Sequence, residues 1–245
     1  MKLADSGLMA LADTYLWAGM GQKIHGLIHN LNNHAHVMDM QVNMLAAKAD
    51  SSADEPLKAY EDKLARLANG TASIVENLQK NGRCSFFAQK SQTQINVHDF
   101  LSWMVDFWGN DLFFKHHISC RLFHEDQGIN LQMPPFYLTL CLEQGIRNVV
   151  EACHEMESSK KHRLQIRALP AGNGGVKIIL QSSTQVPDLD PWAQGSSSKP
   201  GHLGMGLPLA AFLAGRMGWS INLSKGESET GLEIIIPEQK SVERD

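Results

Sequence analysis

An almost unbroken helical pattern near the N-terminus constrains the fold of this 245-residue chain more than any other feature. Between residues 5 and 49, apolar side chains recur at steps of three and four, which keeps one stripe on a single helix face. The stripe comprises Ile24, Ile28, Leu31, Ala35, Met38, Val42 and Leu45. Such a helix would be about 65 Å long. Gly19, Gly21 and Gly26 each cost it roughly 1 kcal/mol of helix propensity, so packing against other elements must hold it.

A second stripe of the same kind runs through residues 56–80, after a polar turn at residues 50–56. Two such helices joined by a short turn predict a helical hairpin. Because a single hairpin leaves half of its stripe in water, we expect two copies to form a four-helix bundle, and the protein to be a homodimer. The alternative is a hairpin that packs on the remainder of its own chain.

The pattern changes after a predicted linker at residues 83–94, because strands with β-branched alternation then alternate with amphipathic helices. We predict helices at residues 97–113, 136–156 and 205–217. We predict strands at residues 118–123, 163–169, 175–181, 219–223 and 232–236. The predicted fold class is α+β, with a hairpin at residues 1–82, an α/β sandwich at residues 95–240 and a tail at residues 241–245.

Composition excludes several classes of protein. A net charge of −4 and a pI near 6.2 argue against a nucleic-acid binder, which needs a basic face to displace counterions. The sequence shows neither a signal peptide nor an apolar run of membrane-spanning length, so we expect a cytoplasmic protein without membrane insertion. Its four cysteines lack the spacing of a zinc site or a disulfide framework.

His29 is the candidate reactive residue of the first helix. It lies one position beyond the apolar stripe, so its imidazole should stay accessible to water. Residues three, four and seven positions away on the same face are polar and uncharged, namely His25, Asn32, Asn33 and His36. Two other interpretations stay open. The histidines could be ordinary surface residues of a bundle helix, or His25 and His29 could share a metal ion, although no Cys, Asp or Glu lies at a suitable ligand spacing.

This stretch resembles the phospho-acceptor box of bacterial two-component histidine kinases. The matching residues are His29-Asn30-Leu31-Asn32-Asn33-His34. The resemblance implies that His29 accepts a phosphoryl group and that Asn33 is at the position that orients a hydrolytic water. The acid that usually follows the histidine is replaced by Asn30, whose amide can orient an imidazole but cannot take a proton at neutral pH.

The rest of the chain resembles the ATP-binding domain of the same kinases. Asn148 matches the second asparagine of the family's asparagine box, while Gln144 replaces the first. Gly204 and Gly206 match the second glycine box, and Lys199 matches a lysine that often precedes it. After residues 176–180 the family has an Asp-x-Gly-x-Gly box that binds adenine. This chain has no glycine there before Gly195, so we expect ATP binding to be lost.

These features predict a histidine-containing phosphotransfer protein that passes phosphoryl groups between response-regulator receiver domains through His29. An aspartyl phosphate is already activated, so the reaction needs neither a nucleotide nor a metal of this chain's own. One alternative is an ATP-dependent histidine kinase, which would use Mg²⁺ and ATP at Asn148, Lys199, Gly204 and Gly206. The other alternative is a dimeric scaffold that binds a response regulator without phosphotransfer.

Overall fold

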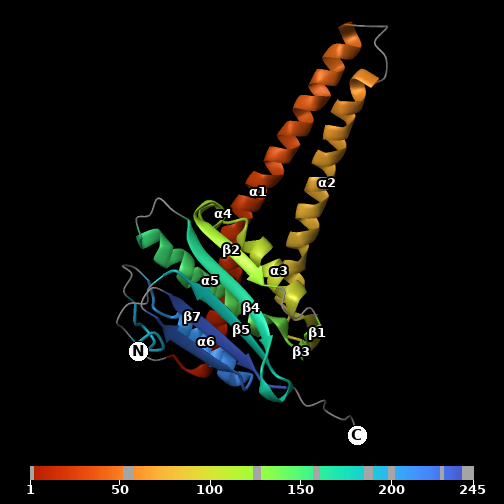
Figure 1. Ribbon diagram of the computed structural model, residues 1–245. Helices are drawn as coiled ribbons and strands as arrows, with labels where there is room; N and C mark the ends of the chain where they lie inside the picture. Colours follow the sequence, from red (N-terminus) through yellow and green to blue (C-terminus); the bar gives the residue numbers. More distant parts are fainter. Residues whose placement is uncertain are drawn as a thin grey trace.

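The computed structural model describes residues 3–51, 58–123, 128–156, 161–184, 190–197, 202–226 and 229–238. Two long helices, α1 (Asp5–Ser51) and α2 (Lys58–Phe87), form a hairpin that projects from an α/β region (Figure 1). The hairpin predicted from the apolar stripes is therefore confirmed. Most of the predicted turn between the helices lies outside the described residues. No helix in the described part of the chain is both long and apolar enough to span a membrane.

The predicted end of the second helix is wrong. Helix α2 continues through Asn81 and Gly82 to Phe87 and so enters the segment expected to be a linker. Phe87 is only 4% exposed, and its ring packs edge-on against Phe100 at 4.9 Å between centroids. Burial of this ring outweighs the roughly 1 kcal/mol of helix propensity that Gly82 costs. The core of the α/β region thus holds the last turns of α2 in place.

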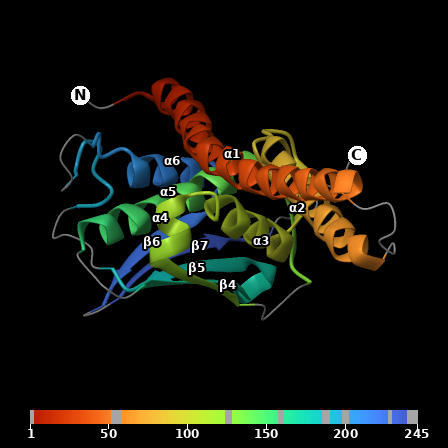
Figure 2. The same ribbon diagram turned by 90° about the horizontal axis from the view of Figure 1, so that it is seen from above.

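The α/β region is a layer of helices on one face of a five-stranded mixed sheet (Figure 2), as predicted. The strand order is β2-β4-β5-β7-β6, with β2 parallel to β4 and all other neighbours antiparallel. These strands are β2 (Ile118–Phe123), β4 (His162–Pro170), β5 (Val176–Ser182), β6 (Ser220–Lys225) and β7 (Thr230–Ile236). Burial alternates along β4 and β5, so every second side chain faces the helical layer.

The helical layer differs from the prediction in one place, because the helix expected at residues 97–113 is two helices. Helix α3 ends at a turn around Gly109, and α4 begins where the Asp111 carboxylate accepts a hydrogen bond from the backbone N–H of Phe114. The helices of this region are α3 (Val97–Trp108), α4 (Leu112–His117), α5 (Pro135–Glu155) and α6 (Gly206–Arg216), with a 3₁₀ turn at Gly172–Gly174. A small antiparallel pair, β1 (Thr93–Asn96) and β3 (Asn130–Met133), was not predicted.

The first half of α1 packs on the α/β region and does not belong to the free part of the hairpin. Leu8, Ala12, Leu16 and Met20 are buried in the same hydrophobic cluster as the sheet. At Gly26 the two parts approach so closely that a Cβ would lie 1.6 Å from the backbone carbonyl oxygen of Asn110. One core therefore joins the hairpin to the sandwich, with His29 just beyond the junction.

Candidate functional site

His29 is exposed on α1, three residues beyond the close contact at Gly26. Asn33, one turn further along the same helix, has its side-chain Nδ2 3.4 Å from His29 Nδ1. The i, i+4 spacing puts these two side chains on one face of the helix. Asn33 therefore contacts the Nδ1 atom of the ring, and the Nε2 atom is the ring nitrogen available for reaction.

The Asn33 amide can set the tautomer of the ring. When Nδ2 donates to Nδ1, the proton of the neutral imidazole is on Nε2. When the amide is rotated by a half turn, its oxygen accepts the Nδ1 proton and the Nε2 lone pair is free to attack an electrophile. A neutral amide can perform this exchange without a change of charge at the site.

Asn30 faces a different direction from His29, because successive helical side chains diverge by about 100°. Its Nδ2 donates to the Asn110 side-chain oxygen at 3.4 Å, and its own oxygen accepts a hydrogen bond from Lys115 Nζ at 3.4 Å. Lys115 is on α4, and no motif in the sequence indicated that it would lie next to α1. The structure thus places His29 with Asn33, and Asn30 with α4.

The metal-ion interpretation of this region depends on His25, and the side chain of His25 lies outside the described atoms. Among the residues that the structure does describe, no group of three or more His, Cys, Asp or Glu side chains could hold a metal ion.

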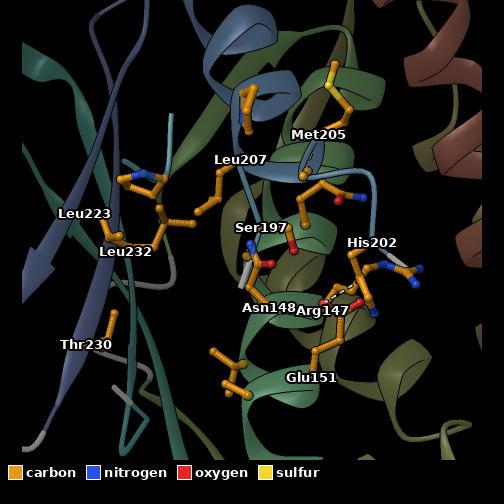
Figure 3. Close-up of a pocket in the computed structure, with 18 of the residues that line it drawn as sticks. Arg147, Asn148, Glu151, Ser197, His202, Met205, Leu207, Leu223, Thr230 and Leu232 are labelled. Carbon is orange, nitrogen blue, oxygen red and sulfur yellow. Dashed lines mark ion pairs between the residues drawn. The ribbon is translucent and has the colours of Figure 1, made fainter. Parts of the chain in front are cut away.

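A cavity of about 210 Å³ lies between α5, the sheet and the segment that leads into α6 (Figure 3). Leu180, Leu223 and Leu232 of the sheet form part of its apolar wall, and Asn148 of α5 lines it. The Asn148 Nδ2 atom is buried and has no hydrogen-bond partner among the described residues. It is therefore a donor available to an acceptor inside the cavity.

The resemblance of the sequence to histidine kinases predicts an adenine-binding carboxylate at one end of this cavity. In place of the family's carboxylate, the buried Ser182 hydroxyl lies 2.6 Å from the Thr184 hydroxyl, and Thr230 donates to the Thr184 carbonyl oxygen at 2.7 Å. These hydroxyl groups have each other as partners. The volume is also below the roughly 300–1,000 Å³ typical of small-molecule pockets. Lys199, another residue predicted for this site, lies outside the described residues.

Gly204 has a backbone reason to be glycine, whereas the close contact at Gly206 is with the end of a side chain. Gly204 has φ +59°, and a Cβ there would lie 2.5 Å from the backbone oxygen of Ser196. A Cβ at Gly206 would lie 2.6 Å from the Gln144 side-chain oxygen. A phosphate-binding role is thus not needed to explain Gly204, and that role stays a prediction for both glycines.

A buried charged cluster joins α1 to α5 beside this cavity, and sequence reasoning missed it. Lys23 Nζ lies 3.6 Å from the Glu143 carboxylate, and both side chains are 2% exposed. Arg147 binds the same carboxylate at 2.5 Å and donates to Gln22 of α1 at 2.7 Å. Lys23 Nζ also lies 3.5 Å from the centre of the Trp108 ring. Burial lowers the pKa of Lys23 to about 8, although the neighbouring Glu143 carboxylate opposes this shift.

No protein-family model and no curated protein sequence matches this chain. Solved structures do match. The nucleotide-free catalytic domain of histidine kinase ThkA aligns with a TM-score of 0.52 at 14% identity, over 60% of this chain and 95% of that domain. Full-length ShkA, solved in complex with AMPPNP, aligns with a TM-score of 0.51 at 13% identity, over 96% of this chain and 46% of ShkA. A structure described as a bacterial phosphotransferase aligns with a TM-score of 0.45, over 96% of this chain and 98% of that protein.

At these identities the likeness shows the fold. The chain has the architecture of the catalytic region of histidine kinases, in which a helical hairpin precedes an ATPase-like α/β sandwich.

Proposed function

We propose that this chain is a histidine-containing phosphotransfer protein of a two-component phosphorelay, with His29 as the residue that carries the phosphoryl group. The observation that carries this proposal is the exposed imidazole on the hairpin, with Asn33 at its Nδ1 and Nε2 left available. The partners are receiver domains of response regulators in the cytoplasm.

The transfer of the phosphoryl group to His29 needs no nucleotide. Nε2 of the neutral imidazole attacks the phosphorus of an aspartyl phosphate, the new N–P bond forms, and the bond to the carboxylate oxygen breaks. Aspartate leaves as a carboxylate, which is a good leaving group, so no general base is needed. The proton on Nδ1 stays within reach of the Asn33 amide. The reverse reaction passes the phosphoryl group to a second receiver.

We further propose that ATP binding has been lost. The adenine end of the cavity has paired hydroxyl groups among its described residues where the family has an acid. The geometry of α1 supports the same view. Tyr15 lines the cavity, and 14 residues of continuous helix separate it from His29, which is about 21 Å along the axis. Because buried residues hold α1 to α5, a donor in this cavity would not reach His29 of the same chain.

The hairpin surface supports a homodimer. Four side chains of α1 are at least 50% exposed and recur at steps of seven, four and fourteen residues along one side of the helix, namely Trp17, Ile24, Ile28 and Val42. Leu64 and Leu78 of α2 are 51% and 52% exposed. A second copy that packs against this surface would complete the four-helix bundle.

A specific observation favours one alternative, an ATP-dependent histidine kinase. The free Asn148 donor faces a cavity at the place where the related fold binds nucleotide. Titration of the protein with Mg-ATP separates the two functions. A dissociation constant in the submillimolar range would support the kinase, whereas no binding at roughly 5–10 mM Mg-ATP would support the relay.

The relay itself is tested with a phosphorylated receiver domain that carries a radiolabelled phosphoryl group. We expect label on this protein that is stable to base and labile to acid. The His29→Ala variant should take up no label, whereas the His36→Ala variant, which removes another exposed histidine of α1, should label normally. Label that persists in His29→Ala would refute the proposal. Receiver binding without any label, unchanged by His29→Ala, would instead identify a scaffold.

A further inference from the structure

A groove of about 400 Å³ lies beside the turn of α1 that carries His29. It is bounded by α1, α2 and the turn between α3 and α4, and Asn30, Asn77, Asn110 and Lys115 are among the residues that line it. Lys115 is exposed, and its Nζ donates to the Asn30 side-chain oxygen at 3.4 Å. A cation from the α/β region therefore lies next to the residue that follows the phospho-acceptor.

The replacement of an acid by Asn30 affects whether the charge of Lys115 is neutralised. A carboxylate at position 30 would form an ion pair with Lys115 and cancel its charge. The neutral amide accepts a hydrogen bond and leaves the charge in place. Among the described residues, the Lys115 ammonium donates to this amide, while Asp106 lines the same groove.

We propose that Lys115 is a phosphoryl-binding residue of the His29 site. Its ammonium binds the anionic oxygens of the incoming phosphoryl group and of the phosphorylated imidazole, which carry close to two negative charges. This inference rests on the proposed function of His29. The replacement of the acid and the position of Lys115 then have one explanation, because the amide keeps the lysine beside Asn30, on the neighbouring side of α1 from His29, with its charge available.

The fold supports such a role for the lysine. Helix α4 is anchored by the buried Phe114 and capped by Asp111, so the backbone of Lys115 is fixed. The long side chain is exposed and held by a single hydrogen bond to a neutral group, so it can turn from Asn30 towards a phosphoryl group on the neighbouring side of α1.

The test uses phosphoramidate, a small anionic phosphoryl donor that needs no partner protein. Nε2 of His29 attacks the phosphorus, the N–P bond to the imidazole forms, and the P–N bond to the amino group breaks with release of ammonia, which takes up a proton. Formation of phosphohistidine is followed by ³¹P NMR and by the mobility of the protein on phosphate-binding gels. The variants are Lys115→Ala, Lys115→Arg, Asn30→Asp and, as a matched exposed lysine immediately before β4, Lys161→Ala.

We expect Lys115→Ala to label about three- to tenfold more slowly, and Lys115→Arg and Lys161→Ala to label at close to the wild-type rate. Raising the salt concentration to about 1 M should reduce the difference between Lys115→Ala and wild type, because the interaction is electrostatic. Asn30→Asp should slow labelling in the wild-type background but have little further effect in Lys115→Ala, since the carboxylate would act by neutralising this lysine.

Equal rates for Lys115→Ala and wild type, with label still on His29, would overturn this inference and leave the proposed function intact. A difference that does not respond to salt, or that Lys115→Arg fails to restore, would also overturn it, because it would indicate a structural role. Label that persists in His29→Ala would refute the function of His29 itself. Thermal unfolding of each variant shows whether a slow rate reflects a loss of folded protein.

Discussion

Replacement of Lys23 by alanine tests how firmly the hairpin is held to the α/β region. The substitution removes one of two cations from the Glu143 carboxylate, which is 2% exposed, and leaves Arg147 as its ion-pair partner. It also removes the lysine ammonium from its position over the Trp108 ring.

The expected loss is large for a single substitution. Breaking a buried ion pair by removal of one partner costs about 3–5 kcal/mol of the free energy of unfolding. Because Arg147 still binds Glu143, we expect the lower end of this range, about 3 kcal/mol. For a protein of this size, 1 kcal/mol shifts the melting temperature by about 2–4 °C, so the shift should be about 6–12 °C.

The measurement is thermal and urea unfolding at neutral pH. A matched control is Lys90→Ala, because Lys90 also pairs with α1, through Asp13, but both side chains are more than 40% exposed. That variant should lose at most about 1 kcal/mol. Equal losses for Lys23→Ala and Lys90→Ala, or a loss below about 1 kcal/mol for Lys23→Ala, would show that the buried cluster does not hold the two parts together.

Three further results are expected. Burial lowers the pKa of Lys23 to about 8, so between pH 8 and about 10.5 the unfolded chain binds more protons than the folded chain. The free energy of unfolding of the wild type, relative to that of Lys23→Met, should therefore rise with pH in this window. Urea titrations of the two proteins at each pH should show a rise of up to about 1.4 kcal/mol per pH unit. Gly26→Ala should destabilise by roughly 3 kcal/mol or more, because a Cβ would collide with the Asn110 backbone, whereas Gly21→Ala, with no atom near its Cβ, should stabilise α1 slightly by calorimetry. Ile28→Glu should convert the expected dimer to a monomer by light scattering; a variant that keeps the wild-type mass would locate the interface elsewhere.

The sequence predicted those parts of the fold that depend on repeated burial. Steps of three and four residues predicted the hairpin, and alternation such as that of residues 232–236 predicted the closing strand of the sheet, because each pattern repeats several times. The two strands β1 and β3 have four residues each, which is too short for alternation to be distinct. The break between α3 and α4 depends on a cap at Asp111, a single residue inside an otherwise amphipathic run.

The candidate site was only partly accessible from sequence, because its second half depends on contacts between distant elements. His29 and Asn33 could be paired from helical spacing alone. The contact between Asn30 and Lys115 joins residues 85 positions apart, and the pair of Lys23 and Glu143 has no local signal. One signal was present in α1, where Leu8, Ala12, Leu16 and Met20 recur at steps of four and form a buried face distinct from the exposed stripe.

The two faces of α1 support the proposal that His29 receives a phosphoryl group without a nucleotide donor in the same chain. Its first half is part of the sandwich core, and its Tyr15 forms one wall of the cavity beside α5. A kinase that phosphorylates its own histidine needs the nucleotide to come close to that histidine, which requires the sandwich to move relative to the hairpin. Here such a movement would expose Leu16 and Met20 and would separate Lys23 from Glu143. The energetic cost of that separation, together with the cation that α4 places beside Asn30, favours a phosphoryl group that arrives from outside on a visiting protein.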